Sequence, residues 1–221
     1  MQSLKSTLRS FSKPDWSPEQ WAEHDAKCAE AAKREQEAML SRRIESAGIP
    51  ERYRSADLAT CPPEVRDWAS AEHNGGGLLL QGTFGSGKTH AACAVLLRKV
   101  PLAPCRFVTM ERLLREIRGA YNGSETEERV ISRYVNVRYL VIDDIGKERL
   151  TEWSLPILFD IVNQRYNRLK PTIITTNYTG ADLLDKLTVN GDSTTAKAIV
   201  SRLATYNRVL LSEKDRRRAN G

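Results

Sequence analysis

A glycine-rich stretch of the sequence has the residue types and spacing that bind the phosphates of a nucleotide. It fits the pattern Gly-x-x-x-x-Gly-Lys-Thr, and its members are Gly82, Thr83, Phe84, Gly85, Ser86, Gly87, Lys88 and Thr89. Glycines permit a tight turn that aims backbone N–H groups at phosphate, the lysine reaches the β- and γ-phosphates, and the threonine hydroxyl holds Mg²⁺. An apolar run at residues 78–81 precedes the loop and an Ala- and Leu-rich run follows it. This is the strand–loop–helix context that the chemistry requires.

Two carboxylates, Asp143 and Asp144, end a second apolar run that begins at Tyr139. Buried carboxylates cost roughly several kcal/mol unless they meet a cation. In a protein that binds a triphosphate this cation is the Mg²⁺ of the nucleotide. We therefore predict that Asp143 is a metal ligand and that Asp144 orients or deprotonates the attacking water. The alternative is that the pair forms a turn or caps a helix, because Gly146 follows closely.

Two further polar residues could contact a γ-phosphate. Asn177 directly follows the apolar run 172–176, and parallel sheets bind ligands in the crevice at their strand ends. Arg202 lies among apolar neighbours in a late helical run, and an arginine at a γ-phosphate stabilises transition-state charge, often from an adjoining subunit. The alternatives are that Asn177 is a turn residue before Gly180 and that Arg202 is an ordinary helix-surface arginine.

Short apolar runs alternate with helical ones along most of the chain, which indicates a parallel sheet with helices on both faces. The predicted strands are 78–81, 106–110, 139–143, 172–176 and 208–211. The predicted helices are 88–99, 111–120, 126–134, 151–168 and 195–205. In this arrangement the phosphate loop, Asp143 and Asn177 all lie at strand ends.

The N-terminal part has a different pattern. Residues 18 to about 47 lack glycine and internal proline and are rich in Ala, Glu, Lys and Arg, which predicts one long helix that stops before Gly48. Its apolar residues are few, so this helix must pack on the rest of the chain or on another protein. The preceding segment adds four apolar residues, Leu4, Leu8, Phe11 and Trp16. These form either a docking surface or a contact with their own chain.

The composition is that of a soluble globular protein, with 28% charged and 40% hydrophobic residues in 221. No apolar run approaches the ~18 residues of a membrane span, and the N-terminus has no secretion signal, so we expect no membrane partner and a cytoplasmic protein. The four cysteines are unevenly spaced and are expected to be reduced structural thiols. The net charge is +6, and residues 1–47 have equal numbers of basic and acidic residues, so the basic excess lies in the remainder.

Taken together, these residues resemble the AAA+ bacterial replicative helicase loaders of the DnaC and DnaI type, a family that overlaps with the IstB-type transposition helpers. The most specific segments are 47–53, 82–89, 139–146, 152–166 and 171–177. The resemblance implies an α/β fold: a AAA+ P-loop NTPase core with a central parallel five-stranded sheet, preceded by an N-terminal helical segment. A full helical lid is expected to be lacking, because the sequence ends soon after the last predicted strand.

The resemblance also implies a role for each site residue, with ATP and Mg²⁺ as cofactors. Residues 82–89 are similar to the Walker A loop, Asp143 and Asp144 to Walker B, Asn177 to sensor 1 and Arg202 to the arginine finger. Many AAA+ ATPases have Glu where Asp144 stands. The shorter side chain retracts the carboxylate by about one methylene, so we expect slow hydrolysis with little loss of ATP binding. Without a lid, a second sensor arginine is either missing or cannot be placed in the sequence, and the nucleotide should exchange easily.

The implied organisation is a helical segment at residues 1–47, which binds a hexameric replicative helicase of the DnaB type, and a AAA+ ATPase domain at residues 48–221. This domain would bind single-stranded DNA and form a homo-oligomer with ATP, in which Arg202 completes a neighbour's site. Single-stranded DNA needs a positive track and, often, aromatic platforms. The candidates are Arg112, Arg115, Arg118 and Tyr121, together with Lys147, Arg149 and Trp153. The alternative is that they are solvated helix faces.

Other functions fit the sequence less well. A transposition helper would coat duplex DNA and recruit a transposase, and residues 1–47 carry no net positive charge for binding DNA. A GTPase would need an Asn/Thr-Lys-x-Asp element, which the sequence lacks, and a small-molecule kinase would need a lid that closes over its substrate. The sequence therefore favours the loader.

Overall fold

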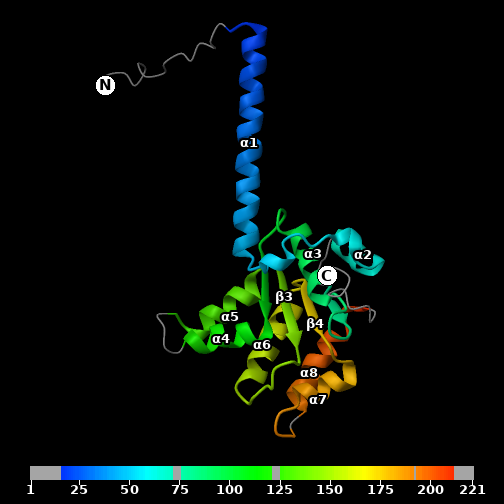
Figure 1. Ribbon diagram of the computed structural model, residues 1–221. Helices are drawn as coiled ribbons and strands as arrows, with labels where there is room; N and C mark the ends of the chain where they lie inside the picture. The colour runs from blue at the N-terminus through cyan, green and yellow to red at the C-terminus, as the bar shows by residue number, and fades with distance from the viewer. Residues whose placement is uncertain (1–15, 72–75, 121–124, 192, 212–221) are drawn as a thin grey trace, which may run out of the picture. The chain divides into compact units, whose positions relative to one another are not determined.

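The computed structural model describes residues 16–71, 76–120, 125–191 and 193–211. The chain divides into two compact units, residues 1–41 and 42–221. The larger unit contains a five-stranded, all-parallel sheet with helices on both faces, as predicted (Figure 1).

The strand order of this sheet places the phosphate loop near the predicted carboxylates. From one edge to the other, the strands are β2 (Cys105–Thr109), β3 (Tyr139–Ile145), β4 (Thr172–Thr176), β1 (Leu78–Gln81) and β5 (Asn207–Leu210). The most buried strands, β1 and β4, lie next to each other away from the edges. Because the strands are parallel, their carboxyl ends meet along one edge of the sheet, where β1, β4 and β3 present three consecutive strand ends.

Helices on the two faces of the sheet differ in number. On one face α3 (Lys88–Lys99) packs against four of the strands and against α2 (Pro63–Ser70). On the other face, alternate strand residues such as Leu79, Ile142 and Ile174 form the main core with five helices. These five are α4 (Met110–Gly119), α5 (Glu127–Asn136), α6 (Ser154–Asn167), α7 (Gly180–Leu187) and α8 (Thr194–Leu203).

The predicted N-terminal helix is confirmed as α1 (Pro18–Ser46), none of whose residues is buried. Its first turns carry an aromatic cluster, in which the ring of Trp16 lies 4.8 Å from the rings of both Trp21 and His24. Leu4, Leu8 and Phe11 fall outside the described residues. No helix in the described part of the chain is long and apolar enough to cross a membrane.

Each predicted strand is confirmed, with its ends shifted by at most two residues, while two helices were missed. Helix α7 begins at Gly180, for which no helix was predicted. Helix α2 begins at Pro63, where two prolines allow a helix to start but not to continue from upstream. The strand β3 also runs two residues beyond its predicted end at Asp143, through Asp144 to Ile145. This extension affects the site directly.

Candidate nucleotide-binding site

The glycine-rich loop connects β1 to α3 in a conformation that needs its glycines. Gly87 has φ +94° and directly precedes the first helical residue, and no side chain caps this helix. A side chain at Gly82, whose φ is +152°, would place a Cβ 2.7 Å from the carbonyl oxygen of Leu211. The first turn of α3 therefore offers its N–H groups to an anion from a backbone that approaches closely.

Lys88 is buried within this loop. Its ammonium donates hydrogen bonds to the carbonyl oxygens of Gly82 at 2.9 Å and of Thr83 at 2.7 Å. These contacts hold a positive charge at the N-terminus of α3, where the helix dipole adds to it. Such a position favours a phosphate group.

Thr89 and Asp143 meet beside the loop although 54 residues separate them in the sequence. The Thr89 hydroxyl lies 3.1 Å from both carboxylate oxygens of Asp143. Burial raises the pKa of Asp143 to about 6, against an opposing hydrogen bond from Thr175, and the charge of Asp144 raises it further. Carboxylate and hydroxyl oxygens are hard ligands, and a bound cation would reverse this shift. The two residues thus fit the Mg²⁺ of a nucleotide.

A bulge in β3 orients Asp144. The pairing of β3 with β4 shifts between Ile142 and Ile145, and within this bulge Asp144 adopts a left-handed conformation with φ +61°. Bulges redirect side chains next to functional sites. Here the bulge lets two consecutive residues serve one site, because Asp143 contacts Thr89 while Asp144 lines the adjoining cleft.

Asn177 lies at the same cleft, one residue beyond β4. Its side-chain oxygen Oδ1 is buried and has no hydrogen-bond partner in the described part of the chain. An unsatisfied buried polar atom calls for an explanation, and a ligand or water in the cleft would supply one. The following residue, Tyr178, is held by its carbonyl oxygen, which accepts a 2.8 Å hydrogen bond from the Gln81 side chain at the end of β1.

The cleft that joins these residues has a volume of about 500 Å³, which is in the range of small-molecule sites. One wall carries phosphate-loop residues, among them Phe84, Lys88 and Thr89. A further part of the lining comes from a segment to which no chemistry was assigned from the sequence. Its lining residues are Arg52, Tyr53, Ser55, Ala56 and Thr60. The only indication in the sequence that this segment contributes to the site was that residues 47–53 belong to the segments that carry the family resemblance.

Arg202 lies apart from this cleft. On α8 its Nε donates to the Oδ1 of Asn163 at 3.0 Å, and its guanidinium lies 4.9 Å from the ring of Phe159 on α6. It does not line the cleft of its own chain. A contact with a γ-phosphate would have to be made in a neighbouring subunit.

A second hollow, of about 340 Å³, brings together residues from both groups of predicted DNA-binding residues. Its lining residues come from α4, from the loop between β3 and α6 and from the first residue of α6; they are Glu111, Leu114, Arg115, Arg118, Glu148, Arg149, Thr151 and Ser154. We call it the arginine groove. The guanidinium of Arg118 lies 4.6 Å from the ring of Trp153, so the two predicted sets of DNA-binding residues are in contact. Lys147 is exposed beside the groove, and Tyr121 falls outside the described residues.

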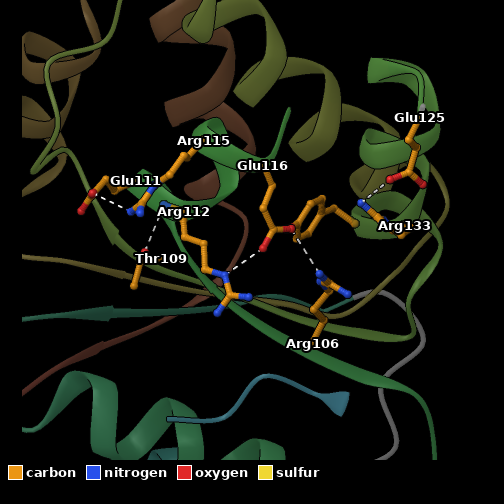
Figure 2. A network of polar contacts seen from close by, with 9 residues as sticks. Arg106, Thr109, Glu111, Arg112, Arg115, Glu116, Glu125 and Arg133 are labelled. Atoms are coloured by element: carbon orange, nitrogen blue, oxygen red, sulfur yellow. Dashed lines mark hydrogen bonds and ion pairs between the residues drawn. The ribbon is translucent and has the colours of Figure 1, made fainter. Parts of the chain in front are cut away.

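Ion pairs anchor α4 next to this groove (Figure 2). Glu116 binds Arg106 of β2 and Arg112, and it accepts a hydrogen bond from Tyr134 of α5. Burial opposes ionisation of Glu116, but these partners together hold its pKa below the ordinary value. Arg112 is thus engaged by the half-buried Glu116, whereas Arg115 pairs with the exposed Glu111. The network fixes the helix that carries Arg115 and Arg118.

A loop of backbone amides between a strand and a helix, with a carboxylate from a nearby parallel strand against its threonine, defines a P-loop nucleotide-binding protein. The sheet order, with β4 between the loop strand and the carboxylate strand, is that of the AAA+ class. The chain belongs to the IstB-like ATP-binding protein family, whose sequence model matches residues 49–220. The protein therefore contains an ATP-binding ATPase domain.

Individual relatives support the same assignment. The chain is 28% identical over 131 residues to the ATP-binding protein of insertion sequence IS5376 from Geobacillus stearothermophilus, covering 59% of this chain and 50% of that protein. It is 31% identical over 115 residues to the replicative helicase loader DnaC of Buchnera aphidicola, covering 48% and 45%. Among solved structures, the DnaC helicase loader superposes with a TM-score of 0.63 at 27% identity, covering 74% of this chain and 100% of that one. The chain spans half or less of the length of the two curated relatives.

Proposed function

We propose that this protein is an ATP-dependent helicase loader, which binds a hexameric replicative DNA helicase of the DnaB type and delivers it onto single-stranded DNA. The observation that carries the proposal is a cleft lined by Lys88, Thr89, Asp144 and Asn177, with Asp143 in contact with Thr89, in a chain whose relatives include DnaC loaders. ATP hydrolysis would act as a slow switch between the states that hold and release DNA.

In the proposed reaction the residues of the cleft bind ATP, orient the attacking water and accept its proton. The amides of the phosphate loop and Lys88 would bind the β- and γ-phosphates, while Thr89 and Asp143 would hold Mg²⁺. When bound, Mg²⁺ neutralises charge that develops on the phosphate oxygens. Asp144 accepts the proton of the attacking water, and Asn177 orients the water or the γ-phosphate with its amide group.

Substitution of Asp144 with glutamate tests whether a retracted carboxylate limits the rate. The longer side chain should reach the water and raise ATP turnover roughly 3- to 10-fold, a modest part of the usual contribution of a general base. A left-handed conformation suits Asp better than Glu, so the melting temperature should fall slightly. Asp144→Asn is the matched control and should stop turnover while ATP binding persists. Turnover of Asp144→Glu at or below the wild-type rate would contradict the retraction account.

Arg202 would act in trans within a homo-oligomer assembled with ATP. Its position on α8, away from the cleft of its own chain, is compatible with contact to a neighbour's γ-phosphate. Arg202→Ala should therefore abolish the rise in specific turnover with protein concentration. It should leave ATP binding by the dilute protein unchanged.

The arginine groove is the proposed site for single-stranded DNA, with arginines for the phosphates and Trp153 as a platform for a base. Arg149→Gln should weaken binding of a fluorescent oligonucleotide about 3- to 10-fold and reduce the salt dependence by about 0.7 in log–log slope, as expected for one lost phosphate contact. Arg66→Gln, an exposed arginine on α2, is the control. Equal affinity and salt slope in the two variants would remove the groove from the proposal.

The N-terminal segment is the proposed contact with the helicase. The aromatic cluster of Trp16, Trp21 and His24 at the start of α1 offers apolar surface beside an otherwise charged helix. The full-length protein should co-elute with a DnaB-type helicase in size-exclusion chromatography, and residues 42–221 alone should not. Trp21→Ala should weaken the complex, whereas Lys33→Ala on the same helix should not. Co-elution of residues 42–221 with the helicase would contradict this assignment.

A transposition helper remains the second candidate, because the IstB-like family and the IS5376 relative both favour it. Such a protein would bind duplex DNA with ATP and recruit a transposase. Direct competition between single-stranded and duplex DNA of the same length distinguishes the two. Preference for duplex, without helicase binding, would favour the helper.

A further inference from the structure

One buried hydroxyl connects the two carboxylates of the site. Thr175 is fully buried in β4, opposite the bulge of β3. Across the bulge, the register runs from Ile142 paired with Ile174 to Ile145 paired with Thr176. Two residues of β3, Asp143 and Asp144, therefore lie opposite a single residue of β4, which is Thr175.

The Thr175 hydroxyl makes one hydrogen bond to each of these aspartates. It donates its proton to the Oδ1 of Asp143 at 2.6 Å and accepts a hydrogen bond from the backbone N–H of Asp144 at 2.8 Å. A hydroxyl has one proton and can accept on its lone pairs, so both bonds can exist at once. The side chain thus satisfies a backbone donor that the bulge removes from the regular strand pairing.

The remainder of β4 is held in a similar way. The Thr176 hydroxyl donates to the carbonyl oxygen of Ile145 at 2.7 Å and accepts from the N–H of Tyr178 at 3.2 Å. Thr175 and Thr176 together tie both sides of the bulge to the strand that leads into Asn177. The positions of Asp143, Asp144 and Asn177 therefore depend on one short segment.

We propose that Thr175 is a positioning residue, which sets the orientation of the Asp143 carboxylate toward Mg²⁺ and keeps Asp144 in its left-handed conformation. The proposal rests on the proposed nucleotide chemistry of the cleft. Thr89 contacts Asp143 from the phosphate loop and Thr175 contacts it from β4, so the carboxylate is held from two sides. Loss of the Thr175 hydroxyl leaves the carboxylate able to rotate and the Asp144 N–H without its acceptor.

A matched control lies on the same strand. Thr172 is also fully buried, and its hydroxyl also donates and accepts, to the carbonyl oxygen of Lys170 and from Arg165. It lies at the opposite end of β4 and lines no part of the cleft. Thr172→Val therefore reproduces the loss of a buried hydroxyl without touching either aspartate.

The test compares the full-length wild type with Thr175→Val, Thr175→Ser and Thr172→Val. Binding of a fluorescent ATP analogue is measured in EDTA and across a Mg²⁺ titration, together with kcat, KM and thermal unfolding. Thr175→Val should need about 10-fold more Mg²⁺ for half-maximal tightening of nucleotide binding, while its affinity in EDTA stays within about twofold of the wild type. The kcat of Thr175→Val should fall by a larger factor than its KM changes. Thr175→Ser keeps a hydroxyl and should recover most of the Mg²⁺ dependence and most of kcat.

Thr172→Val should lower the melting temperature and leave the Mg²⁺ dependence unchanged. If Thr175→Val fails to fold, Thr175→Cys replaces it with the same expectation, because a thiol is a weak hydrogen-bond partner. Wild-type Mg²⁺ dependence in folded Thr175→Val or Thr175→Cys, or the same loss in Thr172→Val, overturns the proposal. Failure of the wild type to bind nucleotide at all would instead overturn the proposed function.

Discussion

Replacement of Lys88 with alanine is expected to weaken ATP binding roughly 100-fold. The ammonium lies within the phosphate loop at the N-terminus of α3, and loss of charge-assisted hydrogen bonds to a phosphate costs about 2–3 kcal/mol. The site would keep its backbone amides but lose its one buried cation among the residues that line the cleft. Equilibrium titration with a fluorescent ATP analogue measures the change.

Lys99 supplies the control for this substitution. It lies on the same helix, it is equally buried, and its ammonium also donates to a backbone carbonyl, that of Ala71. Lys99→Ala should reduce thermal stability and leave ATP affinity within about twofold of the wild type. A similar loss of affinity in both variants would mean that Lys88 acts through stability rather than through contact with phosphate.

Asp143→Asn should reduce ATP turnover by a factor of about 100 or more, since one metal ligand and its charge are lost from the reaction. The substitution keeps the shape of the side chain and can keep the hydrogen bonds from Thr89 and Thr175. Removal of a buried charge should also raise thermal stability at neutral pH, because burial raises the pKa of Asp143 to about 6. The variant should therefore be more stable and nearly inactive.

Higher stability together with lost turnover would identify Asp143 as a functional residue rather than a structural one. Differential scanning fluorimetry and steady-state turnover give the two quantities on the same samples. Asp160→Asn, on α6 and outside the cleft, is the control and should change thermal stability and turnover only slightly. An Asp143→Asn protein that loses stability but retains turnover would contradict the metal role.

Much of the fold could be predicted because its signals are local. Continuous apolar runs identify the buried strands, and the glycine spacing of residues 82–89 identifies the loop and the helix that follows it. The same apolar runs place Asp143 near the end of the third strand and Asn177 directly after the fourth, although β3 continues to Ile145. The coming together of Thr89 and Asp143 follows once the sheet is parallel, because both then lie at its carboxyl edge.

Other parts of the site could not be predicted because they depend on tertiary contacts. The bulge at Asp143 and Asp144 has no sequence pattern of its own, and its partner Thr175 resembles any β-branched strand residue. The cleft lining at Tyr53 and Thr60 comes from two short 3₁₀ turns, of which only the one at Tyr53 lies in a segment that resembles the family. The meeting of Arg118 with Trp153 likewise joins elements 35 residues apart.

Isothermal titration of the full-length protein with ATP, once with Mg²⁺ and once with EDTA, tests the central claim most directly. We expect one nucleotide per chain and an affinity at least about 10-fold higher with Mg²⁺, because Asp143 and Thr89 then act together through the metal on the bound triphosphate. Absence of binding with Mg²⁺ present, or equal affinity under both conditions, would contradict it.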